Sequence, residues 1–156
     1  MVSTPKLKTP VISVSKINHK SGFLHPLVRF VTEETAALLF NLALEEIYRI
    51  DCWQHVVYVH GKGVSKFVSY ADFPPILEVE APTPQDFLRW RKRWKNRWKI
   101  SLAPEFWTKF YKYQFKHAST EANLLSWGKL VAVVKSVLSV VAVEQLRQAY
   151  SYDKDL

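Results

Sequence analysis

Residues 83–99 of the chain read TPQDFLRWRKRWKNRWK, a stretch that combines a helix start with a high density of basic and aromatic residues. Thr83 is suited to the N-cap of a helix and Pro84 to its first position. Asp86 stands three residues after the cap, where a carboxylate completes a capping-box-like opening. The pattern therefore predicts a helix over 84–99.

Aromatic side chains follow one side of this predicted helix. At 3.6 residues per turn they fall within about 80° of arc; they are Phe87, Trp90, Trp94 and Trp98. A period-two alternation would instead make the segment a strand, but Lys92 and Asn96 would then interrupt its apolar face. We therefore favour a helix whose tryptophan side packs into the protein.

Basic side chains cover most of the remaining surface of the predicted helix. Guanidinium and ammonium groups both bind phosphate oxygens, and neither selects a base sequence by itself. We expect a non-enzymatic nucleic-acid-binding protein, with RNA and DNA both open as partners. The expected binding residues are Arg89, Arg91, Lys92, Arg93, Lys95, Arg97 and Lys99, assisted by Lys109, Lys112, Lys116 and the N-terminal lysines.

Charge is distributed unevenly along the chain, whose formal net charge is +8. Residues 1–31 carry five basic and no acidic side chains, and residues 32–86 carry three basic and nine acidic ones. Residues 87–120 carry ten basic side chains against Glu105 alone, and 121–156 are balanced. Segregated charge of this kind attracts polyanions, although the acidic middle could neutralise part of the basic segment within the fold.

Three other modes of binding fit the basic aromatic segment. As an assembly subunit, the protein would dock on an acidic partner protein, since arginine and aromatic residues are enriched in interfaces. Exposed tryptophans could instead stack on the bases of single strands. They could also lie at an anionic membrane surface as a peripheral contact. No stretch is long and apolar enough for a transmembrane segment, because the longest uncharged run of the last predicted helix is 136–143.

The predicted fold class is α+β. A small antiparallel sheet, made of a hairpin over 53–70 and a strand over 76–80, is packed by about four helices. These helices cover 32–50, 84–99, 104–117 and 120–148. The second and third of them are joined by four residues and form a basic aromatic αα-hairpin.

Two of these predicted elements carry further detail. Thr32 caps the first helix, and its apolar residues keep to one face as far as Ile50. A three-residue Gly-Lys-Gly loop would place Val57 opposite Phe67, and Val56 opposite Val68. The segment 120–148 has an amphipathic helical pattern, and its many valines leave a buried strand pair as the alternative.

The domain boundaries follow from composition. We expect a basic extended N-terminal arm over 1–31, with an edge strand at 11–17, then a single domain over 32–150 and a tail over 151–156. The arm lacks the apolar run of a signal peptide, and a mitochondrial presequence stays open. The single cysteine, Cys52, favours a reducing compartment, so we expect an intracellular, cytoplasmic protein.

Few residues offer catalytic chemistry. Cys52 stands three residues before His55, but on a strand these side chains point to opposite faces. A structural zinc site needs four ligands, and the chain has no second cysteine. The HGKG at 60–63 lacks the helix start of a phosphate loop and fits a hairpin turn. We therefore expect no metal, no cofactor and no catalytic residues.

Overall fold

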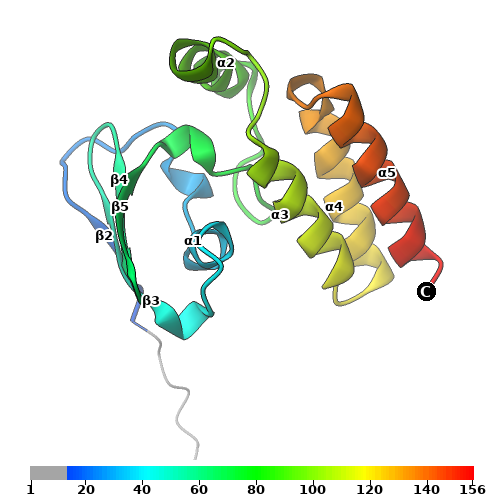
Figure 1. The fold of residues 1–156 in the computed structure, drawn as a ribbon, viewed down its shortest axis with the longest axis horizontal. Coiled ribbons are helices and arrows are strands. Elements are labelled where there is room, and N and C mark those ends of the chain that lie inside the picture. The colour runs from blue at the N-terminus through cyan, green and yellow to red at the C-terminus, as the bar shows by residue number, and fades with distance from the viewer. Residues whose placement is uncertain (1–13) are drawn as a thin grey trace, which may run out of the picture.

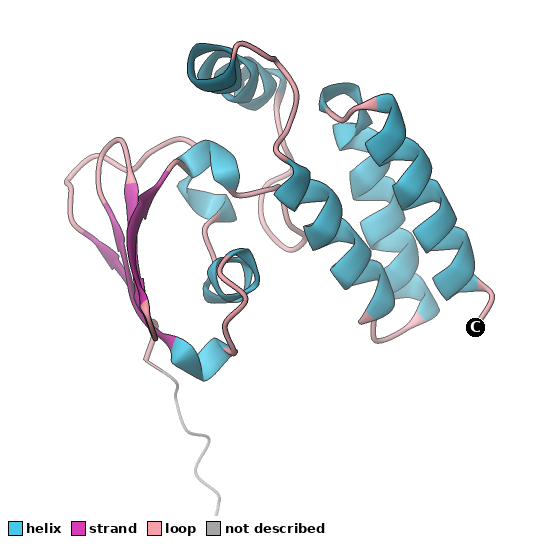
Figure 2. Ribbon diagram, viewed as in Figure 1, coloured by secondary structure: helices cyan, strands magenta, loops and turns pink. Residues whose placement is uncertain are grey.

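The computed structural model describes residues 14–156 and has an α+β architecture, which confirms the predicted fold class (Figure 1). Its four strands lie in the order β2 (Ile17–His19), β3 (Ile47–Cys52), β4 (Val57–Gly61) and β5 (Val64–Val68). The last three are antiparallel, but β2 runs parallel to β3. The sheet is therefore mixed, where the sequence predicted antiparallel strands only. The helices all lie on one side of it (Figure 2).

The predicted hairpin is present with a different register. Val57 pairs with Val68 and Tyr58 with Phe67, one residue later than expected. The turn is shorter than predicted because Gly61 belongs to β4 and pairs with Val64. A Cβ at Gly61 would lie 2.7 Å from the backbone oxygen of Glu46, so β3 can approach only a glycine here.

The first predicted helix ends early. Helix α1 (Glu33–Leu39) starts as expected, with the Thr32 side chain accepting a hydrogen bond from the Thr35 N–H at 3.0 Å. It stops because Asn41 adopts a left-handed conformation with φ of 57°, which asparagine tolerates better than most residues. The prediction of a helix to residue 50 is wrong, since 47–52 form the interior strand β3.

The predicted strand over 76–80 is also wrong. Glu78 has a φ of 67°, which no strand accommodates. The backbone oxygens of Glu80 and Ala81 accept hydrogen bonds from the Arg29 side chain. Strands β2 and β3 complete the sheet in its place.

The four longer helices are α2 (Pro84–Trp98), α3 (Glu105–Lys116), α4 (Glu121–Val134) and α5 (Val140–Lys154). The first two match the predicted bounds within one residue. The predicted helix over 120–148 is two helices, because the chain turns at η4 (Lys135–Val137). The Ser139 hydroxyl then caps α5 by accepting from the Ala142 N–H at 3.0 Å. As a result α3, α4 and α5 form a three-helix layer (Figure 1).

Helix α2 does not lie along α3 as the arm of an αα-hairpin, so this part of the prediction is corrected. It packs on the short helix η3 (Tyr70–Asp72), while α3 packs along α4 and α5. The two helices meet at Trp107, whose ring lies edge-on to Trp90 and Trp94 at centroid distances of 5.2 and 5.0 Å. All three rings are fully buried, so most of the tryptophan stripe is core, as its spacing predicted.

Both ends of the described chain take part in the fold. Of the predicted arm over 1–31, residues 1–13 lie outside the described residues, including three residues of the expected edge strand over 11–17. The described part supplies β2 and buries Leu27 and Phe30. At the other end α5 continues to Lys154, into the predicted tail over 151–156.

Candidate nucleic-acid interface

The cationic residues of α2 fall into groups that point in different directions. Arg89, Lys92 and Arg93 stand at positions i, i+3 and i+4, which share one side of a helix. Arg91 lies elsewhere: its Nη2 donates to Ser136 Oγ at 3.4 Å, and its guanidinium lies 5.7 Å from the Phe87 ring centroid. The predicted basic face is therefore divided by the packing of the helix.

Arg89, Lys92 and Arg93 open onto a cavity of about 500 Å³, which we name the α2 cavity. Its lining residues are His25, Leu27, His55, Ser69, Tyr70, Ala71, Arg89, Lys92, Arg93 and Asn96. The apolar members among them are almost fully buried, so the accessible lining is cationic or hydrogen-bonding. Among the residues that the structure describes, no carboxylate belongs to this lining, so an anion in the cavity would meet cationic side chains.

Two of the three cations lie beyond ion-pair distance of any carboxylate among the described residues. Within residues 14–156, neither Lys92 nor Arg93 forms an ion pair, and both are exposed. Arg93 Nε donates to Ser69 Oγ at 3.3 Å, which holds the guanidinium at the wall of the cavity. Arg89 Nη1 lies 3.4 Å from Asp86 Oδ1, with 42% of its side chain exposed.

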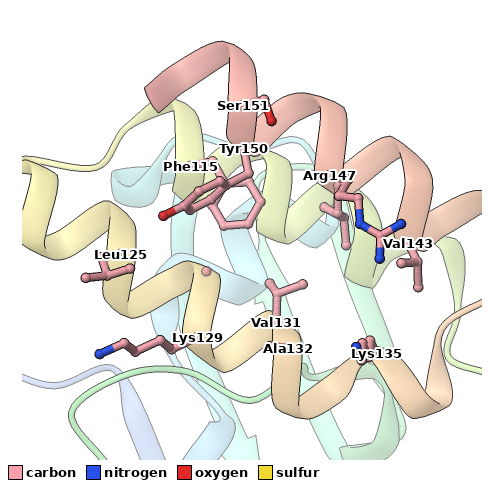
Figure 3. Close-up of a pocket in the computed structure, with 12 residues that line it drawn as sticks. Phe115, Leu125, Lys129, Val131, Ala132, Lys135, Val143, Arg147, Tyr150 and Ser151 are labelled. Atoms are coloured by element: carbon pink, nitrogen blue, oxygen red, sulfur yellow. The ribbon is translucent and has the colours of Figure 1, made fainter. Parts of the chain in front are cut away.

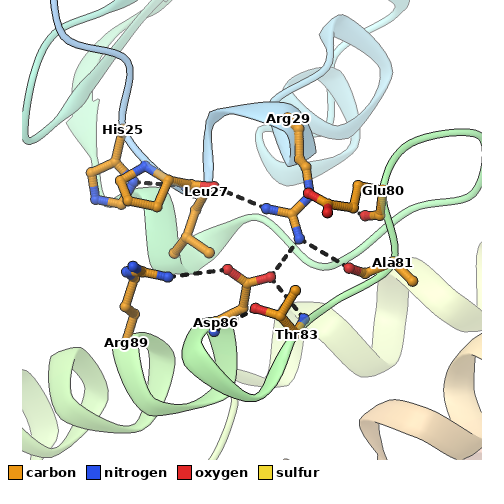
Figure 4. Close-up of polar contacts among 9 residues, drawn as sticks. His25, Leu27, Arg29, Glu80, Ala81, Thr83, Asp86 and Arg89 are labelled. Carbon is orange, nitrogen blue, oxygen red and sulfur yellow. Dashed lines mark hydrogen bonds and ion pairs between the residues drawn. The ribbon is translucent and has the colours of Figure 1, made fainter.

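Asp86 lies beside the cavity, and Arg29 neutralises it (Figure 4). A second carboxylate nearby, Asp72, accepts from the Ser69 N–H at 3.0 Å and pairs with Arg97. The Oδ2 of Asp86 accepts from Arg29 and from the Thr83 N–H, and the side chain is 2% exposed. Burial alone would raise its pKa, but the hydrogen bonds from Arg29 and Thr83 and the charge of Arg29 lower that pKa below the ordinary value of 3.8. Asp86 is therefore ionised and pairs with Arg29, which leaves Arg89 a surplus positive charge.

His25 is a partly buried imidazole in the wall of the cavity. Its Nδ1 accepts a hydrogen bond from the Leu27 N–H at 3.0 Å, and its ring stacks on Tyr70 at 4.0 Å. Burial lowers its pKa to about 4, and the positive charges of Arg89 and His55 add to this effect. His25 is consequently neutral near pH 7, and because Nδ1 accepts, Nε2 carries the ring proton and can donate.

The C-terminal end of α2 is less strongly cationic. Arg97 lies 3.5 Å from Asp72 and over the ring of Trp98, whose centroid is 4.6 Å from the guanidinium carbon. Trp98 is 40% exposed, unlike the other tryptophans of the stripe. Lys95 and Lys99 are exposed and do not line the cavity. These two lysines could assist a ligand that extends beyond the cavity.

The lysines of α3 lie apart from the α2 cavity. Lys109 Nζ donates to Asn41 Oδ1 at 2.6 Å, and Lys112 Nζ to Gln145 Oε1 at 3.4 Å. Lys116 is exposed near the far end of α3. None of the three lines the cavity. Of the four N-terminal lysines, Lys6 and Lys8 lie outside the described residues, and Lys16 and Lys20 do not line the cavity either.

Sequence reasoning missed the far wall of the cavity. His25, Ser69 and Tyr70 come from segments that no spacing in the chain connects with α2. His55 was considered only as a neighbour of Cys52. The structure buries that thiol at the end of β3, and burial raises its pKa. Within residues 14–156, no three His, Cys, Asp or Glu side chains gather to hold a metal ion.

Comparison with known proteins finds no family model, no curated protein and no solved structure that matches this chain. In the part of the chain that the structure describes, no helix is long and apolar enough to cross a membrane.

Proposed function

We propose that this protein binds the phosphate backbone of nucleic acid at the α2 cavity. One observation carries the proposal: Arg89, Lys92 and Arg93 face His25 and His55 across a space whose lining contains no carboxylate. The fork of an arginine side chain matches two phosphate oxygens, and a lysine ammonium adds a compact charge. Phosphate contacts do not distinguish RNA from DNA, so we propose both as ligands.

The polar lining favours nucleic acid over an acidic partner protein. Protein interfaces have apolar and aromatic centres, whereas Leu27, Tyr70 and Ala71 are each only 2% exposed in the α2 cavity. Peripheral membrane contact has less support, because Trp90 and Trp94 are buried and cannot enter a headgroup layer. The acidic-protein alternative predicts binding that depends little on phosphate.

We further propose a non-enzymatic role in the cytoplasm. The single cysteine, Cys52, fits a reducing compartment, and the residues around the α2 cavity suit binding. Lys95 and Lys99, which are exposed near the C-terminal end of α2, would lengthen the contact along a strand. Arg91 is committed to Ser136 and Phe87 and is the least available of the seven basic residues first expected to bind.

Binding should depend steeply on salt. We expect a fluorescein-labelled oligonucleotide of about 20 nucleotides to lose about 100-fold in affinity between about 50 and 200 mM salt, if roughly four phosphates are contacted. The double variant Lys92→Glu/Arg93→Glu should bind at least about tenfold more weakly, and its salt slope should be shallower by about 2. Fluorescence anisotropy over a salt series measures both quantities.

A matched control separates local contacts from net charge. Lys129→Glu/Lys135→Glu changes the charge of the protein by the same amount, at exposed positions that do not line the α2 cavity. This control should keep the wild-type salt slope. Equal losses of affinity in the two variants would exclude the proposed interface and favour the acidic-protein alternative. Wild-type binding that is absent or insensitive to salt would do the same.

A further inference from the structure

A second concave surface lies on the three-helix layer, between α4 and α5 (Figure 3). Both helices pack on α3 more extensively than on each other, so a groove of about 430 Å³ remains along their outer seam. Its lining residues are Phe115, Leu125, Gly128, Lys129, Val131, Ala132, Lys135, Val143, Leu146, Arg147, Tyr150 and Ser151. We name it the α4–α5 groove.

Gly128 and Tyr150 shape one end of this groove. A Cβ at Gly128 would lie 2.5 Å from Cε1 of Tyr150, so only glycine lets the tyrosine ring lie against α4. The same ring packs edge-on against Phe115 at a centroid distance of 5.3 Å. The helices are thus held together at this end, and the remaining seam stays open.

The floor and rim of the groove differ in chemistry. Val131, Val143 and Leu146 supply an apolar floor. Lys129 and Lys135 stand on the α4 side and Arg147 on the α5 side, so cations flank the floor from both helices (Figure 3). No carboxylate lines the groove, although Glu144 lies 3.6 Å from Arg147 on the outer surface of α5.

Helix α4 exposes apolar side chains in the groove. Leu125 is 49% exposed, and Ala132, two turns further along α4, is exposed as well. Exposed apolar side chains gathered in a groove are typical of a surface that binds a partner. The apolar floor therefore calls for a ligand with an apolar side.

We propose that the α4–α5 groove binds an amphipathic helix of a partner protein, with leucine-like residues on one face and carboxylates beside it. Groove residues span 125–135, along α4 and the first residue of η4, which is about 15 Å at the helical rise and matches nearly three turns of a docked helix. Apolar residues at i, i+3/i+4 and i+7 would enter the floor. Carboxylates beside the apolar face of the docked helix would pair with the three cations of the rim, which face no carboxylate within the groove.

A helix with several carboxylates fits better than a single fatty acid or a nucleic acid. A fatty acid carries one negative charge, whereas the groove offers cations on both walls and at separate turns of α4. A phosphate backbone has no apolar face to cover Val131 and Val143. This site is separate from the α2 cavity and does not depend on the proposed function.

The test uses a fluorescein-labelled peptide of about 16 residues, helical by design, with leucine on one face and glutamate on its flanks. We expect the full-length protein to bind it, and Ala132→Trp, which fills the groove, to weaken binding at least tenfold. Gln148→Trp places the same ring on an exposed position of α5 outside the groove and should leave binding unchanged. Circular dichroism checks that each variant is folded.

Charge reversal provides the second arm of the test. Lys129→Glu/Lys135→Glu should weaken the binding of the glutamate peptide and strengthen the binding of a peptide with lysine in place of glutamate. No peptide binding, or binding that Ala132→Trp leaves unchanged, would overturn the proposal. Displacement of the peptide by decanoate or by anionic vesicles at lower concentration would assign the groove to lipid and also overturn it. Lys92→Glu/Arg93→Glu should leave peptide binding intact, so failure here is distinguishable from failure at the α2 cavity.

Discussion

Replacing Trp94 with alanine should lower the free energy of unfolding by about 3–5 kcal/mol, the range for removing a buried tryptophan. Its ring is fully buried, stacked on Trp90 and edge-on to Trp107. Its Nε1 donates to the Ala71 oxygen at 3.1 Å, so the substitution also leaves a buried acceptor unpaired. Because Ala71 lines the α2 cavity, loss of Trp94 should loosen the site together with the core. Urea denaturation followed by circular dichroism measures the change.

Trp98 is the matched control for this prediction. It belongs to the same stripe and the same helix, but it is 40% exposed and packs chiefly on Arg97. We expect Trp98→Ala to cost less than about 1 kcal/mol, in the range of surface substitutions. Similar losses for the two variants would mean that the tryptophan cluster is not the centre of the core.

Asp86→Asn should destabilise the protein by about 3 kcal/mol, because it leaves the guanidinium of Arg29 without its buried counter-charge. Only 19% of the Arg29 side chain is exposed, and its other contacts in this network are backbone oxygens and the exposed Glu80. Glu80→Gln is the control, since Glu80 lies 4.0 Å from the same arginine but is 76% exposed. We expect it to cost no more than about 0.5 kcal/mol. Equal effects would contradict the neutralising role of Asp86.

The same carboxylate gives stability a definite pH dependence. Since the folded-state pKa of Asp86 is lowered, its contribution is complete well above the ordinary aspartate pKa of 3.8 and is lost as the pH falls through and below that value. His25 acts at higher pH, because its folded-state pKa of about 4 lies below the ordinary 6.5. As the pH falls from 6.5 towards about 4, the unfolded chain takes up the proton first, and the free energy of unfolding decreases. The difference between wild type and Asp86→Asn isolates Asp86, because His25 is common to both.

The sequence predicted best where local chemistry decides the structure. The Thr83–Asp86 capping box starts α2 where the residues indicated, and the spacing of Trp90 and Trp94 identified the buried side. The prediction of an αα-hairpin was wrong, because the pairing of two helices depends on the other elements that pack against each of them. Trp107 joins α2 to α3, but α2 otherwise packs on η3, and α3 packs mainly on α4 and α5.

Other features depend on contacts distant in the sequence. The residues of β3 have an apolar spacing that also suits a helix. The left-handed backbone of Asn41 and the short 3-10 helix η2 (Leu44–Glu46) separate them from α1. The α2 cavity needs His25 and His55 brought to α2 by the sheet and η3. Its cations were identified from the sequence, but their division between the cavity, Arg91 and the α3 lysines follows from packing alone.

The most direct test of phosphate binding at the α2 cavity is a ¹H–¹⁵N NMR titration of the full chain with a mixed-sequence oligonucleotide, recorded to include the arginine Nε–Hε signals. We expect the largest shifts at the side chains of Arg89 and Arg93 and at the backbone amides of Ser69 and Ala71, all of which line the cavity. Unchanged signals there, with shifts confined to the outer face of the sheet around Tyr58 and Phe67 or to the α4–α5 groove, would contradict the proposed site.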